Sequence, residues 1–255
     1  MNQISQNWDF FFCQIEGSPA SIRVNLGLYE VAPIQDFSKS IRFLVKMQNP
    51  TAEGLSSNEE YPVLCDIEDA LFEVLASKNA LMAGSVKCDG FLEFWVYAQN
   101  TDGLEADFGV MMKKSFANYK SGYQEFDDSE WDTYFNFLYP DAFSMQSIMN
   151  RKLYRQLQEQ GDDETVAREI DHWLYFSSQE DALAFCEKAK SLVYSILSER
   201  KLDEHPDDTH PYQVHITRQD TPSLDTMDDV VWELMEVVAP LNGIYDGWGC
   251  NIVKS

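Results

Sequence analysis

Hydrophobic and polar residues alternate with period two along much of the first half of the chain. Three segments share the alternation, residues 8–12, 21–28 and 41–47, and two further strand segments, 81–88 and 91–98, flank Asp89-Gly90. This period is typical of β-strands with one buried face, and it places Trp8, Phe10 and Phe12 on the hydrophobic face of the first strand. Asp89-Gly90 tolerates the positive φ of a two-residue turn, so the last two segments are predicted to form a hairpin.

Between these strands the hydrophobic period changes to that of helices. Residues 64–75, 104–116 and 131–138 repeat at helical spacing, and the third of these segments ends before Pro140. A further strand is expected at 119–126. The first half therefore predicts an α/β sandwich with an antiparallel sheet, similar to the plait expected for the second half.

The second half has the order βαββαβ. Its predicted elements are a strand at 170–176, a helix at 177–193, strands at 194–199 and 212–218, a helix at 226–240 and a strand at 248–253. Ser177 and Glu180 have the spacing of a capping box at the first helix. This order is that of a ferredoxin-like plait. We expect an α+β protein with domains at 1–141 and 161–255, joined by a helix at 142–160.

Composition adds two constraints to this picture. The chain has 255 residues, 44% of them hydrophobic, which suits two globular domains better than a disordered chain. The net charge is −24, from 22 − 9 = 13 excess carboxylates in residues 1–150 and 21 − 10 = 11 in residues 151–255. Neither half offers the basic surface that a nucleic acid needs. The acidity fits either attraction to a basic protein segment or solubility in the cytoplasm.

The cysteines and the N-terminus bear on location. Five cysteines, an odd number with no C-x-x-C spacing, are typical of reduced core residues. Residues 1–8 lack a basic region followed by an apolar run, and no stretch approaches the ~20 apolar residues of a membrane span. We expect a cytoplasmic protein.

The C-terminal domain carries three recognisable motifs. They are Gly161-Asp162-Asp163, Ile170-Asp171-His172 and Tyr245-Asp246-Gly247-Trp248-Gly249. Through these motifs, residues from about 161 to 253 resemble the bacterial family of regulators of ribonuclease activity B, whose members inhibit the endoribonuclease ribonuclease E. The resemblance implies a regulator that binds a protein.

The N-terminal domain resembles a different family. The motifs are Trp8-Asp9-Phe10-Phe11-Phe12, Pro19-Ala20-Ser21-Ile22, Ile67-Glu68-Asp69-Ala70-Leu71 and Trp131-Asp132-Thr133-Tyr134. They are similar to those of domain of unknown function 695, which brings no activity with it. The tandem of both domains is similar to a group of bacterial proteins without assigned biochemistry.

Alternation also predicts a candidate binding surface in the second domain. With the strand order 4-1-3-2, the strand with His172 lies beside the strand with His215, and His172 is interpreted as a hydrogen-bonded core residue. Asp171, Trp173 and Tyr175 then share the uncovered face with His215. The full set of candidate partner-binding residues is Asp171, Trp173, Tyr175, His215, Tyr245, Asp246 and Trp248.

The aromatic members of this set would form a platform, which proteins use in several ways. RNA-recognition modules surround such a platform with Lys and Arg, which are missing here. Burial against the other domain, burial against a second subunit, and contact with a partner protein stay open as its uses.

Catalytic motifs are sparse in this sequence. G-x-S-x-G, H-E-x-x-H, P-loop and G-x-G-x-x-G patterns do not occur. His205 and His210, with Asp207 and Asp208, have a spacing that suits a divalent ion, but such an acidic loop is more often only solvated. Glu59-Glu60 and Asp127-Asp128 are interpreted as charges at helix starts.

Three functional hypotheses follow. The leading one is an acidic, non-enzymatic regulator that binds a protein, such as a ribonuclease with a basic segment, rather than RNA or a membrane, and needs no metal or cofactor. The first alternative is a metal-dependent or hydrolytic enzyme with an interdomain site. The second is a structural protein whose open sheet is covered in cis.

Overall fold

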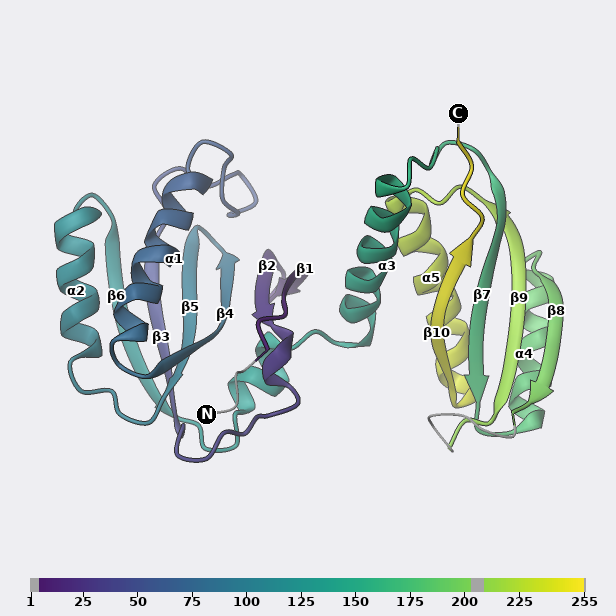
Figure 1. The fold of residues 1–255 in the computed structure, drawn as a ribbon, viewed down its shortest axis with the longest axis horizontal. Coiled ribbons are helices and arrows are strands. Elements are labelled where there is room, and N and C mark those ends of the chain that lie inside the picture. The colour runs from purple at the N-terminus through teal and green to yellow at the C-terminus, as the bar shows by residue number, and fades with distance from the viewer. Residues whose placement is uncertain (1–4, 203–208, 255) are drawn as a thin grey trace. The chain divides into compact units, whose positions relative to one another are not determined.

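A computed structural model describes residues 5–202 and 209–254 of the chain. The chain divides into two compact units, Met1–Ser144 and Met145–Ser255 (Figure 1). Each unit consists of one antiparallel sheet with packed helices, so the predicted α+β class with two domains is confirmed. Among the described residues, no helix combines the length and the apolar character that crossing a bilayer demands.

The first unit contains a six-stranded sheet in the order β1-β2-β4-β5-β3-β6, with antiparallel pairs throughout. From β3 onward the chain runs strand, helix, two strands, helix, strand, and these strands have the spatial order 4-1-3-2. The hairpin of β1 and β2 extends the sheet beyond β4. The elements are β1 (Trp8–Ile15), β2 (Ser18–Asn25), β3 (Lys39–Lys46), α1 (Tyr61–Ala76), β4 (Ala80–Cys88), β5 (Phe91–Ala98), α2 (Leu104–Ser115) and β6 (Lys120–Asp127).

Both faces of this sheet are covered over its centre. α1 and α2 pack on the face that carries Phe43 and Phe94, which are fully buried. On the other face the Trp131 ring stacks on Tyr97 with centroids 3.8 Å apart. Tyr97 donates a 2.6 Å hydrogen bond to Asp128, whose carboxylate also accepts from the backbone N–H groups of residues 132 and 133. Asp128 therefore satisfies two backbone N–H groups directly before the short helical segment Tyr134–Leu138.

The predicted face of the first strand is wrong in part. Phe11 is 5% exposed, whereas Phe10 is 36% and Phe12 64% exposed. The strand register places Phe10 and Phe12 opposite Arg23 and Ser21, on the sheet face that carries α1. Because α1 covers β4 and not the hairpin, these rings stay accessible. Trp8, on the same face, packs edge-on against α1, as expected of a hydrophobic-face residue.

The second unit contains a four-stranded sheet in the order β10-β7-β9-β8, which is the predicted order 4-1-3-2. All three strand pairs are antiparallel. The elements are α3 (Ala142–Glu159), β7 (Arg168–Phe176), α4 (Gln179–Ser191), β8 (Ser195–Lys201), β9 (Tyr212–Asp220), α5 (Leu224–Val238) and β10 (Gly243–Cys250).

The helices of this unit share one face of the sheet. Residues of α4 and α5 enclose the fully buried Leu174 and Phe176 of β7. α3 contributes Leu157 to the same core and lies beside α5, where Asn150 donates a 2.7 Å hydrogen bond to Asp228 (Figure 1). The opposite face of the sheet is therefore left open by the unit's own described helices.

Two predicted boundaries in this unit are corrected. The last strand was expected at 248–253, but β10 spans Gly243–Cys250, because Gly243 already pairs with Phe176. A Cβ at Gly243 would lie 2.6 Å from the Phe176 ring, so this close approach requires glycine. The N-cap of α4 is Ser178, not Ser177, and its hydroxyl accepts a hydrogen bond from the backbone N–H of Asp181.

Candidate functional site

The open face of the second sheet is built by alternate residues of two neighbouring strands. β7 contributes Asp171, Trp173 and Tyr175, and β9 contributes Gln213, His215 and Thr217. We call these six residues the open face. Trp173 lies directly opposite His215 in the register, because each strand turns every second side chain to the same side. The structure thus places four of the candidate residues together: Asp171, Trp173, Tyr175 and His215.

At the centre of the open face, an aromatic pair is held by a carboxylate. The rings of Trp173 and His215 stack with centroids 4.9 Å apart and planes 19° apart. The Nε2 atom of His215 lies 2.9 Å from a carboxylate oxygen of Asp171. On the other side of Trp173, Gly249 offers only backbone, and a Cβ there would lie 3.5 Å from the indole ring. The His215 ring and the Gly249 backbone therefore orient the indole.

A second cluster on the same face joins three strands. Gln213 donates a 2.8 Å hydrogen bond to the Tyr175 hydroxyl, and its side-chain oxygen accepts from Arg200 at 2.9 and 3.0 Å. Sequence reasoning missed Arg200, because it ended that strand at Glu199, whereas β8 continues to Lys201. The strand-like alternation that continues past Glu199 to Lys201 was the signal that could have placed Arg200 on this strand. Arg200 is the basic side chain of this cluster, and Gln213 holds its guanidinium in place.

Two of the candidate residues lie on the opposite, covered side of the sheet. Tyr245 is 8% exposed and Trp248 is 6% exposed, and both belong to the core. The Trp248 indole donates a 2.9 Å hydrogen bond to Asn150 of α3. Strict alternation would turn residues 245 and 248 to opposite faces. The register shifts between Tyr245 and Gly247, and this bulge inserts one residue and brings both rings to the core.

The prediction that Trp248 joins the open platform is therefore wrong, and Tyr245 is not accessible to a partner either. Asp246 is exposed at the bulge itself. It lines a groove with residues of α3, and among the residues described no hydrogen bond or ion pair joins it to the open face.

His172 occupies the core behind the open face. Its side chain is fully buried, and its Nδ1 atom lies 2.8 Å from the Tyr245 hydroxyl. Burial lowers the pKa of His172 to about 3, so the ring is neutral at physiological pH. This environment matches the interpretation of His172 as a hydrogen-bonded core residue.

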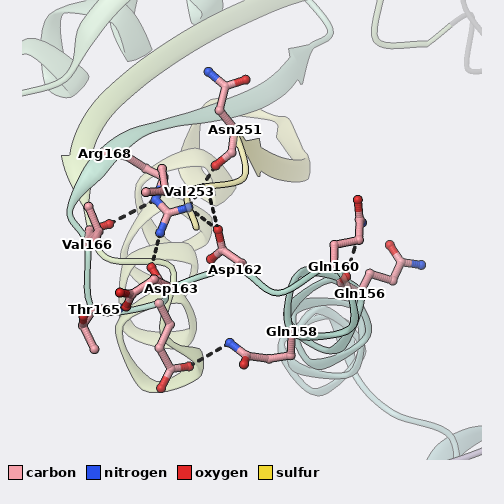
Figure 2. A network of polar contacts seen from close by, with 11 residues as sticks. Gln156, Gln158, Gln160, Asp162, Asp163, Thr165, Val166, Arg168, Asn251 and Val253 are labelled. Carbon is pink, nitrogen blue, oxygen red and sulfur yellow. Dashed lines mark hydrogen bonds and ion pairs between the residues drawn. The ribbon is translucent and has the colours of Figure 1, made fainter. Parts of the chain in front are cut away.

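The Gly161-Asp162-Asp163 motif has a different position, between the end of α3 and the start of β7. Figure 2 shows Arg168 and Asp162 in a buried ion pair that fastens the residues after β10. The guanidinium donates to the carbonyl of Asn251 at 2.9 Å, and Asp162 accepts from the backbone N–H of Val253 at 2.8 Å. The backbone N–H of Asp163 donates to the carbonyl of Val253. We call this set the C-terminal clamp, and its geometry indicates stabilisation rather than chemistry.

The possible metal loop falls mostly beyond what the structure describes. His205, Asp207 and Asp208 lie outside the described residues, and His210 forms a 2.8 Å hydrogen bond with Thr209. Within residues 5–202 and 209–254, no group of three or more His, Cys, Asp or Glu side chains is arranged to hold a metal ion.

Comparison with protein families gives two matches along the chain. Residues 6–139 match the model of a family of unknown function, DUF695. Residues 147–250 match the model of the family described as regulator of ribonuclease activity B. The predicted tandem of these two families is confirmed. No curated protein matches the sequence.

Solved structures give only distant similarities. An unknown protein from Galdieria sulphuraria is 9% identical, with 82% of this chain and 96% of that chain covered and a TM-score of 0.22. Chlorite dismutase from Candidatus Nitrospira defluvii in complex with imidazole is 11% identical, with 84% and 89% covered and a TM-score of 0.23. Similarities at these TM-scores carry no information on the function of the chain.

Proposed function

Because this chain belongs to the family of unknown function DUF695 and also carries a region that matches regulator of ribonuclease activity B, we propose that it is a non-enzymatic regulator of a ribonuclease E-type endoribonuclease. In this proposal the second unit binds the enzyme itself and not its RNA. The open face is the binding surface, with Trp173 as its central residue.

The observation that carries the proposal is the stack of Trp173 on His215 on the sheet face that the unit's own helices leave open. Tryptophan is enriched among the residues that dominate protein–protein binding, because it buries a large rigid surface at small entropic cost. Here Asp171 and Gly249 fix the surroundings of the indole before a partner arrives. A preorganised aromatic residue of this kind supports a role in binding.

Charge favours a protein partner over RNA. A sheet that stacks bases normally surrounds its aromatic residues with free Lys and Arg side chains. On the open face, Arg200 is held by Gln213, and Asp171 contributes a carboxylate beside the platform. The second unit as a whole has 21 − 10 = 11 excess carboxylates. Such a surface would repel a phosphate backbone and attract a basic protein segment.

A binding measurement with purified ribonuclease E tests the proposal. Calorimetry would compare the natural chain with Trp173→Ala, and with Trp232→Ala as the matched control. Trp232 is 44% exposed on α5, on the helical side of the unit. A central aromatic contact of about 2 kcal/mol predicts that Trp173→Ala weakens the affinity about 30-fold. We expect Trp232→Ala to bind as the natural chain does.

The same samples distinguish the two kinds of partner. Added salt should weaken binding to ribonuclease E, and the chain should lower the cleavage of a short RNA by the enzyme without binding the RNA itself. Absence of binding to the enzyme, binding to the RNA alone, or equal affinities of the two tryptophan variants would refute the proposal.

A further inference from the structure

The first unit contains a cleft at the part of its six-stranded sheet that its two helices do not cover. A helix about 10 Å wide covers about two strands, which lie ~4.8 Å apart. Two helices therefore cover four of the six strands, and the hairpin of β1 and β2 projects past α1. Between the hairpin and α1 lies a cleft of about 500 Å³, closed on a third side by the loop before α1. Its principal lining residues are Phe10, Phe12, Arg23, Leu55, Tyr61 and Lys87. We call it the β1–α1 cleft.

The loop wall of the cleft is held in place by hydrogen bonds. The backbone N–H of Thr51 donates to the carbonyl of Leu55 at 2.7 Å, and Gly90 donates to the carbonyl of Gly54 at 2.9 Å. At the base of the loop, the buried carboxylate of Glu60 accepts two backbone N–H groups at 2.7 Å each. The cleft is thus formed without a ligand, as most small-molecule sites are.

The hairpin side of the cleft is apolar and accessible. Phe10 and Phe12 contact each other edge to face, with centroids 5.7 Å apart. Phe12 is 64% exposed, although removing a ring of this size from water is favourable. Two neighbouring accessible rings beside Leu55 form a surface that suits an aromatic or aliphatic group of a ligand.

The opposite side of the cleft contains a cation, Lys87, that forms no direct ion pair, although the nearby Glu68 carboxylate acts on its charge. Lys87 lies opposite Ser21 in the register, and its ammonium group sits 4.6 Å from the centre of the Tyr61 ring. No hydrogen bond or ion pair joins this ammonium group to another described residue. Burial lowers the pKa of Lys87. Arg23, the second cation of the cleft, is already paired with Glu68.

We propose that the β1–α1 cleft binds a small amphipathic anion, an aromatic or branched apolar group that carries a carboxylate. The apolar group would lie against Phe10, Phe12 and Leu55, and the carboxylate would accept hydrogen bonds from the Lys87 ammonium group. Phe10 and Lys87 lie on different strands with β2 between them, so a ligand would span the cleft.

The carboxylates near the cleft include Glu68, which is paired with Arg23 and also acts on Lys87, and Glu53. Glu53 lines the loop wall but is exposed, so water and salt screen its charge. Lys87 is the charge that burial has partly deprived of water, and a desolvated charge interacts more strongly with a ligand. A cationic ligand would also be repelled by both Arg23 and Lys87. This inference does not depend on the open face of the second sheet.

The test compares two ligands that differ only in charge, naphthalene-2-carboxylate and naphthalene-2-carboxamide. Calorimetry on the full chain should show the carboxylate binding about tenfold more tightly, since the ammonium group forms a stronger hydrogen bond with a carboxylate than with the neutral amide oxygen. Lys87→Met should abolish this difference, and Lys87→Arg should retain part of it. Phe12→Ala should weaken both ligands by a similar factor.

Lys113→Met, at an exposed position on α2, serves as the matched control and should leave both affinities unchanged. The comparison of the two ligands on the natural chain needs no variant, so it decides the matter even if Lys87→Met fails to fold. Equal affinities for acid and amide, no binding of the acid, or a charge preference that survives in Lys87→Met would overturn the proposal.

Discussion

The C-terminal clamp is expected to hold the second unit together, and Asp162→Ala tests this most sharply. The side chains of Asp162 and Arg168 are 0% and 8% exposed, so neither charge is hydrated. Asp162 accepts hydrogen bonds from Arg168 and from the backbone N–H of Val253. The substitution removes the anion and leaves the cation buried.

The structure sets the size of the effect. Removing one partner of a buried ion pair costs about 3–5 kcal/mol, because the remaining charge is uncompensated. In the variant, the carbonyls of Asp163, Val166 and Asn251 still accept from Arg168, which offsets part of this cost. The Val253 N–H loses its acceptor, which adds about 1 kcal/mol. We expect the free energy of unfolding of the second unit to fall by about 3–4 kcal/mol.

Cysteine labelling in urea measures each unit separately. Cys186 and Cys250 report on the second unit, and Cys13, Cys65 and Cys88 report on the first. Brief labelling with a thiol reagent, followed by mass spectrometry of the peptides, gives an unfolding curve for each cysteine. The curves of the second unit should shift to lower urea in Asp162→Ala, while those of the first unit stay in place.

Two variants complete the test. Glu187→Ala removes an exposed pair with Lys190 and should shift no curve. Arg168→Met combined with Asp162→Ala should cost at least about 1 kcal/mol less than the sum of the single changes, because the two residues act on each other. A cost of Asp162→Ala below about 1 kcal/mol, the value of a surface pair, or single changes that simply add would contradict a stabilising clamp.

Three further predictions concern stability. The pKa of His172 is lowered to about 3 in the folded state, whereas an unfolded histidine has a pKa of ~6.5. As the pH drops below ~6.5, His172 is protonated in the unfolded chain and not in the folded chain, so the free energy of unfolding falls. Between pH 7 and pH 5 the natural chain should therefore lose about 2 kcal/mol more than His172→Gln, measured by urea unfolding at each pH. Trp248→Ala should destabilise the second unit by about 3–5 kcal/mol, because it leaves a cavity and removes the hydrogen bond to Asn150; a loss below 1 kcal/mol would contradict its place in the core. Tyr97→Phe should destabilise the first unit by about 1–3 kcal/mol, because Asp128 loses a buried donor, and unchanged labelling of the first unit's cysteines would contradict this.

The sequence predicted the elements well where one face of a strand is buried and the other is polar. β7 is the clearest case, because its residues alternate strictly between buried and accessible positions from Arg168 to Phe176. The Asp89-Gly90 turn was predicted for a similar reason, and both residues take the positive φ that a two-residue hairpin requires. At these places the local pattern and the tertiary packing agree.

The faces of two strands, β10 beside the candidate site and β1 in the first unit, were predicted less completely. In β10 the bulge before Gly247 reverses the faces, and nothing in the composition of Tyr245-Asp246-Gly247-Trp248 distinguishes a bulge from a regular strand. In β1 the alternation of Trp8, Phe10 and Phe12 is ambiguous because Phe11 makes the other face apolar too, so the covered face depends on where the helices pack. Tertiary packing decided both cases.

Fluorine NMR on the chain labelled with 5-fluorotryptophan tests the central claim most directly. Trp173 and Trp232 would be assigned from their phenylalanine variants and followed while purified ribonuclease E is added. The proposed regulator predicts that the Trp173 resonance shifts or broadens with saturation, and that the Trp232 resonance keeps its position. An unchanged Trp173 resonance in the presence of bound ribonuclease E, or no response of any tryptophan, would contradict binding through the open face.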